Sequence, residues 1–270
     1  MKIPGTIAAV LFVICTPLLL ISLNLGFMVN TNQLYEYGFD KYDIPEVTGI
    51  DSDELARAAD HLIDYFNGSE DSPQIRVAKN AEEINLFSQR EIDHLKDVKG
   101  IIQLFYLILW ITLGYVVIYL AVGFIIRKRD FLRPLMKRLF QGGILTITLF
   151  AFVGIWALID FDSLFLRFHL TSFQNDLWQL DPSQDYLIMM FPEGFFSDAA
   201  LLLVGDTVLE AMILIGASWL YLRRNPPPQL QEAQLPDEQP AQELPPPTGT
   251  DTPPESLANE ANIEIDRSAP

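Results

Sequence analysis

Four long runs of apolar residues constrain this chain more than any other feature of its sequence. A helix needs roughly 20 apolar residues to cross a bilayer core about 30 Å thick, whereas a soluble domain divides its apolar residues into shorter periodic patterns. None of the four runs contains Lys or Arg. We therefore predict membrane-spanning helices at about 7–28, 101–126, 139–159 and 199–222.

The first run shares one feature with a cleaved signal peptide, because Lys2 gives it a short basic start. However, the run is longer than the apolar core of a usual signal peptide, and no Ala-x-Ala-like cleavage site follows it. Asn24, Gly26 and Asn30 lie where such a site would be sought. We expect this run to be retained as the first spanning helix.

The basic residues predict the orientation of these helices. Lys2 precedes the first run, and a basic cluster within 127–138 lies between the second and third runs. Arg223 and Arg224 directly follow the fourth run. The positive-inside rule places these three basic segments in the cytoplasm. The segments 30–98 and 162–197 would then lie outside, with both chain termini cytoplasmic.

The predicted fold class is a membrane all-α protein, a four-transmembrane-helix bundle with a small mixed extracytoplasmic cap. Residues 1–224 would form this domain, and the cap would be the segment 30–98. Apolar residues recur at helical spacing over 51–66, which predicts an amphipathic helix. Two short runs, 75–78 and 84–87, flank a turn-like Lys79–Asn80 and predict a β-hairpin.

The other two segments outside the runs have distinct compositions. The segment 162–197 is dense in aromatic residues, which gather at membrane interfaces, so we expect an interfacial loop. Residues 225–270 are rich in Pro and acidic residues, a composition typical of disorder. We expect this cytoplasmic tail to have no catalytic role.

Charge and cysteine content exclude several classes of function. The net charge of −17 argues against a nucleic-acid partner, because phosphate binding needs Lys and Arg patches. A single cysteine, Cys15, rules out a structural disulfide and Cys-x-x-Cys redox chemistry. We interpret Cys15 as a small apolar residue of the first helix.

Three histidines are the candidate catalytic side chains. His61 lies on the predicted cap helix, where an ordinary surface or half-buried histidine is expected. His94 lies just before the second apolar run and His169 just after the third. Each taken singly is interpreted as a polar residue at a helix end. However, a short loop joins these two runs into an antiparallel hairpin, so both imidazoles should meet at its outer end.

Acidic residues accompany both histidines. Glu91, His94 and Asp97 are spaced by three and would share one side of a helix, where a carboxylate can hold the tautomer of an imidazole and raise its basicity. Asn175, Asp176 and Asp181 follow His169. Such a group would serve either as a general acid–base pair or as a metal site.

The residues around the two histidines form two motifs. The first consists of Glu91, His94, Asp97 and Val98. The second consists of Phe168, His169, Phe173, Asn175, Asp176, Trp178, Asp181 and Pro182, followed by Leu187, Ile188, Phe191, Pro192, Phe195 and Phe196. These motifs resemble the bacterial lipoprotein intramolecular transacylase family, Lit. The similarity covers about residues 5–222 and includes the four-helix plan, and the tail lies outside it.

The resemblance implies a reaction and its site. Such enzymes move the sn-2 acyl chain of an S-diacylglyceryl cysteine to the α-amine of that cysteine, giving a lyso-form lipoprotein. His94 and His169 would be the catalytic pair, with no cofactor and no metal. The expected substrate-binding, oxyanion-binding or orienting residues are Arg90, Glu91, Asp97, Asn175, Asp176, Trp178 and Asp181. The partners would be a diacylated lipoprotein and membrane lipid, and the enzyme would act as a monomer in the bacterial plasma membrane.

Two other functions remain open at this point. One is a metal-dependent membrane hydrolase that uses Glu91, His94, Asp97 and His169, and the other is a non-catalytic membrane sensor or assembly protein.

Asp206 and Glu210 lie four residues apart within the fourth run. Ionisable groups at such a position are costly and are usually paired or functional. We interpret them as a protonated, hydrogen-bonded structural pair, and the resemblance implies no role for them.

Overall fold

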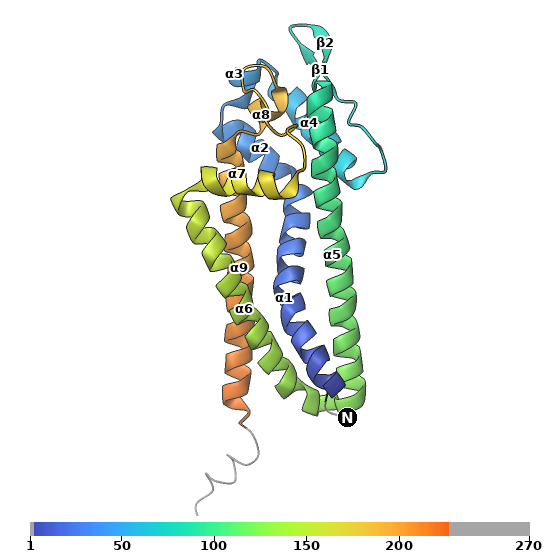
Figure 1. Cartoon of the computed structure of the whole chain (residues 1–270), viewed down its shortest axis with the longest axis vertical. Coiled ribbons are helices and arrows are strands. Elements are labelled where there is room, and N and C mark those ends of the chain that lie inside the picture. Colours follow the sequence, from blue (N-terminus) through green and yellow to red (C-terminus); the bar gives the residue numbers. More distant parts are fainter. Residues whose placement is uncertain (1–2, 227–270) are drawn as a thin grey trace, which may run out of the picture. The chain divides into compact units, whose positions relative to one another are not determined.

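The computed structural model describes residues 3–226, so the predicted disordered tail lies almost wholly outside the described residues. Four long helices carry the apolar runs: α1 (Ile3–Val29), α5 (Gln89–Arg127), α6 (Leu132–Ile159) and α9 (Glu193–Arg224). α1 contacts each of the other three, and α6 packs along α9 (Figure 1). The prediction that each apolar run is helical is confirmed.

Three segments of the described chain are helical, long and apolar enough to cross a membrane: Gly5–Val29, Gln89–Ile159 and Glu193–Arg224. The second of these contains two helices, because the short 3₁₀ helix η1 (Lys128–Phe131) turns the chain between α5 and α6. In Figure 1 the two helices run from this elbow toward the same end of the bundle. The elbow is packed closely, since the ring of Phe131 lies directly against Gly123 of α5.

Two adjacent glycines let α6 lie close to two other helices. A Cβ atom on Gly142 would lie 2.5 Å from Thr16 Oγ1 of α1, and a Cβ on Gly143 would lie 2.7 Å from Ile215 Cγ1 and 3.0 Å from the Ala211 carbonyl oxygen of α9. Small residues at such crossings permit close helix contact within membranes. The tandem glycines therefore hold α6 between α1 and α9.

Asp206 and Glu210 of α9 do not form the predicted hydrogen-bonded pair in the described chain. Asn24 of α1 donates through Nδ2 to Glu210 Oε2 at 2.9 Å and to Thr207 Oγ1 at 3.2 Å. Glu210 therefore joins α9 to α1, and no hydrogen bond links it to Asp206 in the described chain.

The segment between α1 and α5 forms a small mixed cap, as predicted. It contains α2 (Asn32–Lys41), α3 (Ile44–Thr48) and α4 (Ser52–Asn67), followed by β1 (Arg76–Lys79) and β2 (Glu82–Asn85). The strands pair antiparallel. Their turn lies at Asn80 and Ala81, both with positive φ, one residue later than the predicted Lys79–Asn80 turn.

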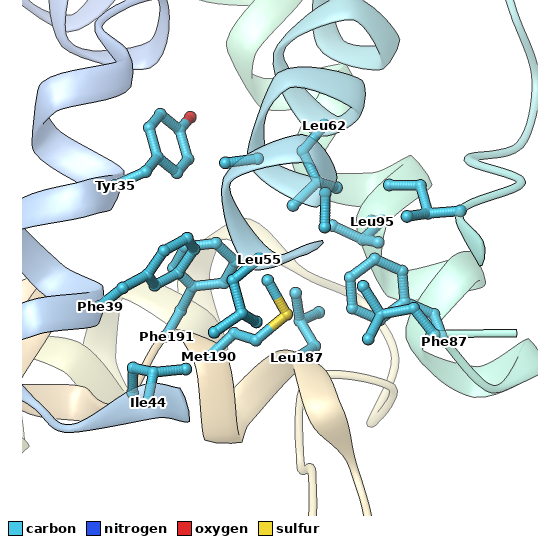
Figure 2. Packing of buried hydrophobic residues seen from close by; sticks show 14 of the residues in the cluster. Tyr35, Phe39, Ile44, Leu55, Leu62, Phe87, Leu95, Leu187, Met190 and Phe191 are labelled. Atoms are coloured by element: carbon cyan, nitrogen blue, oxygen red, sulfur yellow. The ribbon is translucent and has the colours of Figure 1, made fainter. Parts of the chain in front are cut away.

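The cap has its own hydrophobic core, shown in Figure 2. Leu55 and Leu62 of α4 contribute to it, as does Phe39 of α2. The short helix α8 (Tyr186–Met190) adds Leu187 and Met190, although it follows α6 in the chain. Because Leu95 of α5 belongs to the same core, the start of α5 is held firmly against the cap.

A polar contact also attaches the cap to α9. Asp198 accepts hydrogen bonds from Lys41 Nζ at 2.5 Å and Tyr42 Oη at 2.8 Å. Two glycines allow this approach, because a Cβ on Gly194 would collide with the ring of Tyr42 and one on Gly38 with the ring of Phe195.

Candidate active site at the start of α5 and the end of α7

His94 lies in the second turn of α5, where a capping box fixes the start of the helix. The Ser88 side chain accepts from the backbone N–H of Glu91, and Glu91 Oε2 accepts from the backbone N–H of Ser88 at 2.7 Å. Such reciprocal capping satisfies two backbone donors that a helix start leaves free. The position of His94 is therefore set from its own helix start.

Glu91 makes a second contact that reaches far along the chain. Its Oε1 accepts from the backbone N–H of Leu187 at 2.7 Å, and the residue is only 1% exposed. Both carboxylate oxygens thus bind backbone N–H groups. Instead of reaching the imidazoles, Glu91 joins the start of α5 to the start of α8.

His169 lies in the last turn of α7 (Phe161–Ser172), the helix that crosses the end of the bundle beside the cap (Figure 1). Its Nδ1 lies 2.8 Å from the carbonyl oxygen of Phe165. Because a carbonyl oxygen only accepts, Nδ1 must carry the proton. The neutral ring therefore has its lone pair on Nε2.

The two imidazoles lie side by side in an aromatic surround. Their ring centroids are 6.3 Å apart, and the two residues are 6% and 7% exposed. Phe173 contacts both rings, and its centroid lies 5.1 Å from that of His94 and 5.5 Å from that of His169. Trp178 and Phe165 lie against His169 at 4.9 and 4.3 Å.

This burial keeps both histidines neutral at pH 7. Burial and, to a smaller extent, the nearby His169 lower the pKa of His94 to about 4, against the opposing effect of the Asp97 charge. Burial also lowers the pKa of His169, against the effect of its hydrogen bond to Phe165. Each ring can therefore accept a proton at neutral pH.

The loop after α7 is attached to α5 by two contacts. Asn175 Nδ2 donates to Asp97 Oδ2 at 2.8 Å, while Asn175 Oδ1 accepts from the backbone N–H of Leu177. Arg90 donates to the carbonyl oxygen of Asp176 at 2.8 Å. These contacts place Trp178 of the same loop over His169. They also engage Arg90 and Asn175, two of the residues predicted to bind the substrate or the oxyanion or to orient the site.

Asp181 has a local role in that loop. Its carboxylate accepts from the backbone N–H and hydroxyl of Ser183 and from Gln184 Nε2. It closes a turn, and it makes no hydrogen bond to His94 or His169 in the described chain. Asp176 accepts through Oδ1 from Gln179 Nε2 at 3.3 Å, which is also a contact within the loop.

The donor set proposed for a metal-dependent hydrolase does not converge. Within residues 3–226, no three side chains of His, Cys, Asp or Glu gather where they could hold a metal ion. The reason for Glu91 is plain, since backbone N–H groups take both of its oxygens.

A family model described as "Lipoprotein intramolecular transacylase Lit" matches residues 10–196, more than half of the chain. The chain belongs to the Lit family. The match contains both histidines of the site and ends at the second motif, so it agrees with the resemblance carried by the two motifs.

Solved structures have the same fold. The membrane integral Lit of Bacillus cereus has a TM-score of 0.68 at 24% identity, covering 83% of this chain and 100% of that one. A second structure of the same protein, with a histidine replaced by alanine, has a TM-score of 0.65 at 23% identity and covers 81% and 94%. The Lit fold shared with these membrane proteins and the apolar helices make this chain a membrane protein.

A further relative comes from Aquifex aeolicus. This uncharacterized protein is 26% identical over 186 residues, which is 67% of this chain and 80% of the relative.

Two features of this Lit site are absent from the sequence predictions. The carbonyl oxygen of Phe165 sets the tautomer of His169, and its place four residues earlier on a helix is a signal that could have suggested the contact. The backbone N–H of Leu187, the second partner of Glu91, has no sequence signal. His61, by contrast, is exposed on α4 as predicted.

Proposed function

We propose that this Lit-family enzyme moves the sn-2 acyl chain of an S-diacylglyceryl cysteine to the α-amine of the same cysteine. The product is an N-acyl, S-monoacylglyceryl lipoprotein. One observation carries the proposal: two buried imidazoles, both neutral at pH 7, lie with their ring centroids 6.3 Å apart. No cofactor is required for this transfer.

The proton balance of the reaction suits a pair of bases. An α-amine has a pKa near 8 and arrives as an ammonium. Forming the amide removes two protons from this nitrogen, while the bond between the acyl carbon and the sn-2 oxygen breaks. One proton goes to the sn-2 oxygen, and the other leaves to solvent. Two neutral imidazoles can accept these protons and return one.

The two histidines would divide this work. Nε2 of His169 has its lone pair available because Nδ1 is fixed on Phe165, so it would take the first proton from the ammonium. Nδ1 of His94 is buried and has no hydrogen-bond partner in the described chain, so it is available to the reacting groups. Because donor ester and acceptor amine belong to one molecule, binding mainly has to orient them.

The other predicted site residues would act around this pair. Trp178 covers His169, Arg90 and Asn175 hold the loop that carries Trp178, and Glu91 positions the helix start that carries His94. Asp176 and Asp181 would shape the loop. The oxyanion would be stabilised chiefly by the imidazole that is protonated at that moment.

The proposed topology has four spans, with α5 and α6 each crossing once. At about 1.5 Å per residue, each of α1, α5, α6 and α9 exceeds the roughly 30 Å of a bilayer core. The cations Arg127, Lys128 and Arg129 lie at the elbow between α5 and α6, and α9 ends at Arg223 and Arg224, which favours a cytoplasmic location for both. The termini would be cytoplasmic and the site would lie at the extracytoplasmic face of the bacterial plasma membrane.

Within this topology, residues 1–224 would be the catalytic domain, with the cap at 30–98 and the interfacial loop at 162–197. The enzyme would act as a monomer on a diacylated lipoprotein among membrane lipids. The interfacial position of α7 is supported by its exposed Leu166, Phe168 and Leu170, which would face acyl chains.

The proposal is tested by expressing this chain in a host that makes only diacylated lipoproteins. Mass spectrometry of lipoprotein N-termini should then show the lyso form, in which one acyl chain is on the amine. Unchanged diacylated N-termini, in cells where the inserted protein is detected, would refute the reaction. A non-catalytic sensor predicts this second result.

A further inference from the structure

The substrate amine enters a site that offers it little compensation for its charge. It arrives as a cation, because its pKa lies near 8, and a buried cation is costly unless a charge or hydrogen bonds compensate it. His94 and His169 are buried and neutral at pH 7, and their other neighbours are aromatic rings. Some group nearby must therefore receive the ammonium.

Most carboxylates near the site are already engaged. Both oxygens of Glu91 accept from backbone N–H groups. Asp176 and Asp181 accept from side chains of their own loop. Asp93, which directly precedes His94 in the sequence, accepts a hydrogen bond from Gln89 Nε2.

In the described chain Asp93 and Asp176 also accept through one oxygen each, so what distinguishes Asp97 is its position. It follows His94 by three residues on α5, so the two side chains share one side of the helix, and its charge acts on His94. Its Oδ2 accepts from Asn175 Nδ2 at 2.8 Å. Within residues 3–226 no donor binds its Oδ1 and no cation pairs with it.

Asn175 fixes the orientation of the Asp97 carboxylate before the substrate binds. The amide is itself fixed, because its Oδ1 accepts from the backbone N–H of Leu177, so Nδ2 holds Asp97 in one orientation. A neutral amide orients a carboxylate without neutralising its charge. Asp97 therefore has a fixed position, a full charge and one free oxygen beside His94.

We propose that Asp97 binds the α-ammonium of the substrate and holds it beside His94 before the proton is removed. This inference rests on the proposed function and adds a requirement on the substrate. The site accepts a lipoprotein with a free N-terminal ammonium. A lipoprotein whose amine is already acylated lacks that charge and loses the contact. Asp97 discriminates between the two by charge, without a steric block.

Two unreactive ligands test the proposal by binding alone. In both, the diacylglyceryl cysteine peptide has ether links in place of its esters, so no acyl group can move. One ligand keeps the α-amine, and the other has hydrogen in its place. A hydrogen bond to a charged group contributes about 1.5–3 kcal/mol, so the wild type should bind the amine ligand roughly ten- to a hundredfold more tightly.

Asp97→Asn should abolish this preference and leave the affinity for the ligand without the amine unchanged, which also reports that the variant is folded. Asp93→Asn removes the same charge from the same helix and should keep the preference. Asn175→Ala keeps the charge of Asp97 but loses its orientation, so it should reduce the preference without abolishing it.

The outcomes separate this inference from the proposed function. Equal binding of both ligands by the wild type, or an undiminished preference in Asp97→Asn, would overturn the role of Asp97 and leave the transacylase reaction standing. Binding of neither ligand by the wild type would overturn the proposed function and this inference together.

Discussion

At the scale of single residues, burial distinguishes His94 and His169 from ordinary histidines and, in the proposed mechanism, makes them a reactive pair. The sequence predicted their proximity, because a short loop makes α5 and α6 a hairpin and the two histidines lie beyond its outer ends. It could not predict their protonation, because this depends on Phe165, Phe173 and Trp178 closing around the rings. That enclosure lowers both imidazole pKa values.

The lowered pKa values predict an unusual pH dependence. A histidine with an ordinary pKa near 6.5 would lose its basic form as the pH falls through that value. Here the pKa of His94 lies at about 4 and that of His169 is also lowered, so both remain bases at lower pH. The acid limb of the transfer rate should therefore lie clearly below pH 6.5, measured by product formation in detergent or vesicles.

The exposed His61 provides the control for this pH profile. His61→Ala should leave the acid limb where it is in the wild type, because His61 lies on the cap and takes no part. An acid limb centred near pH 6.5 in the wild type would show that the reacting imidazoles are solvated, contrary to the structure.

At the scale of helices and strands, length and periodicity predicted most of the fold. The four apolar runs lie within α1, α5, α6 and α9, and the amphipathic pattern of 51–66 appears as α4, shifted by one residue. The short helices α2, α3 and α8 were not predicted, because tertiary packing in the cap core stabilises them. The hydrogen bond from the Leu187 backbone N–H to Glu91 could not be predicted from the sequence either. Every residue except proline carries a backbone N–H, so the residue type gives no signal for this contact.

The tandem glycines of α6 give a prediction about helix packing. Gly143→Val should destabilise the protein by about 1–3 kcal/mol, the usual cost of overpacking, because even a Cβ would lie 3.0 Å from the Ala211 carbonyl oxygen of α9. Thermal unfolding of the purified protein measures this.

Gly114→Ala is the matched control for this substitution. A Cβ on Gly114 meets no atom within 4 Å, and alanine favours the helix, so this variant should be as stable as the wild type or slightly more stable. An unchanged unfolding temperature in Gly143→Val would contradict the close contact of α6 with α9.

At the scale of the whole molecule, the proposed orientation decides whether substrate can reach the site. Lipoproteins are displayed at the extracytoplasmic surface in the proposed reaction, so the cap and both histidines must face that side. The basic residues favour this arrangement, and the helices of the fold are long enough for it.

Reporter fusions test this orientation directly. A reporter placed after Arg133, near the elbow between α5 and α6, should behave as cytoplasmic. A reporter inserted near Ser69, in the exposed loop after α4, should behave as external. A cytoplasmic signal from the Ser69 insertion would place the histidines on the wrong side of the membrane for the proposed substrate.

The central claim is that His94 and His169 act as one acid–base unit, and transfer rates of the single and double alanine variants test it most directly. His94→Ala and His169→Ala should each abolish transfer, and the double variant should be little worse than either, because groups that act together are strongly non-additive. His→Asn at either position keeps a polar side chain without a titratable base and should also be inactive.

His61→Ala should keep full activity, and a chelator should have no effect. Near-normal transfer by folded, membrane-inserted His169→Ala would contradict the two-histidine mechanism, and inhibition by a chelator that zinc reverses would favour the metal-dependent hydrolase.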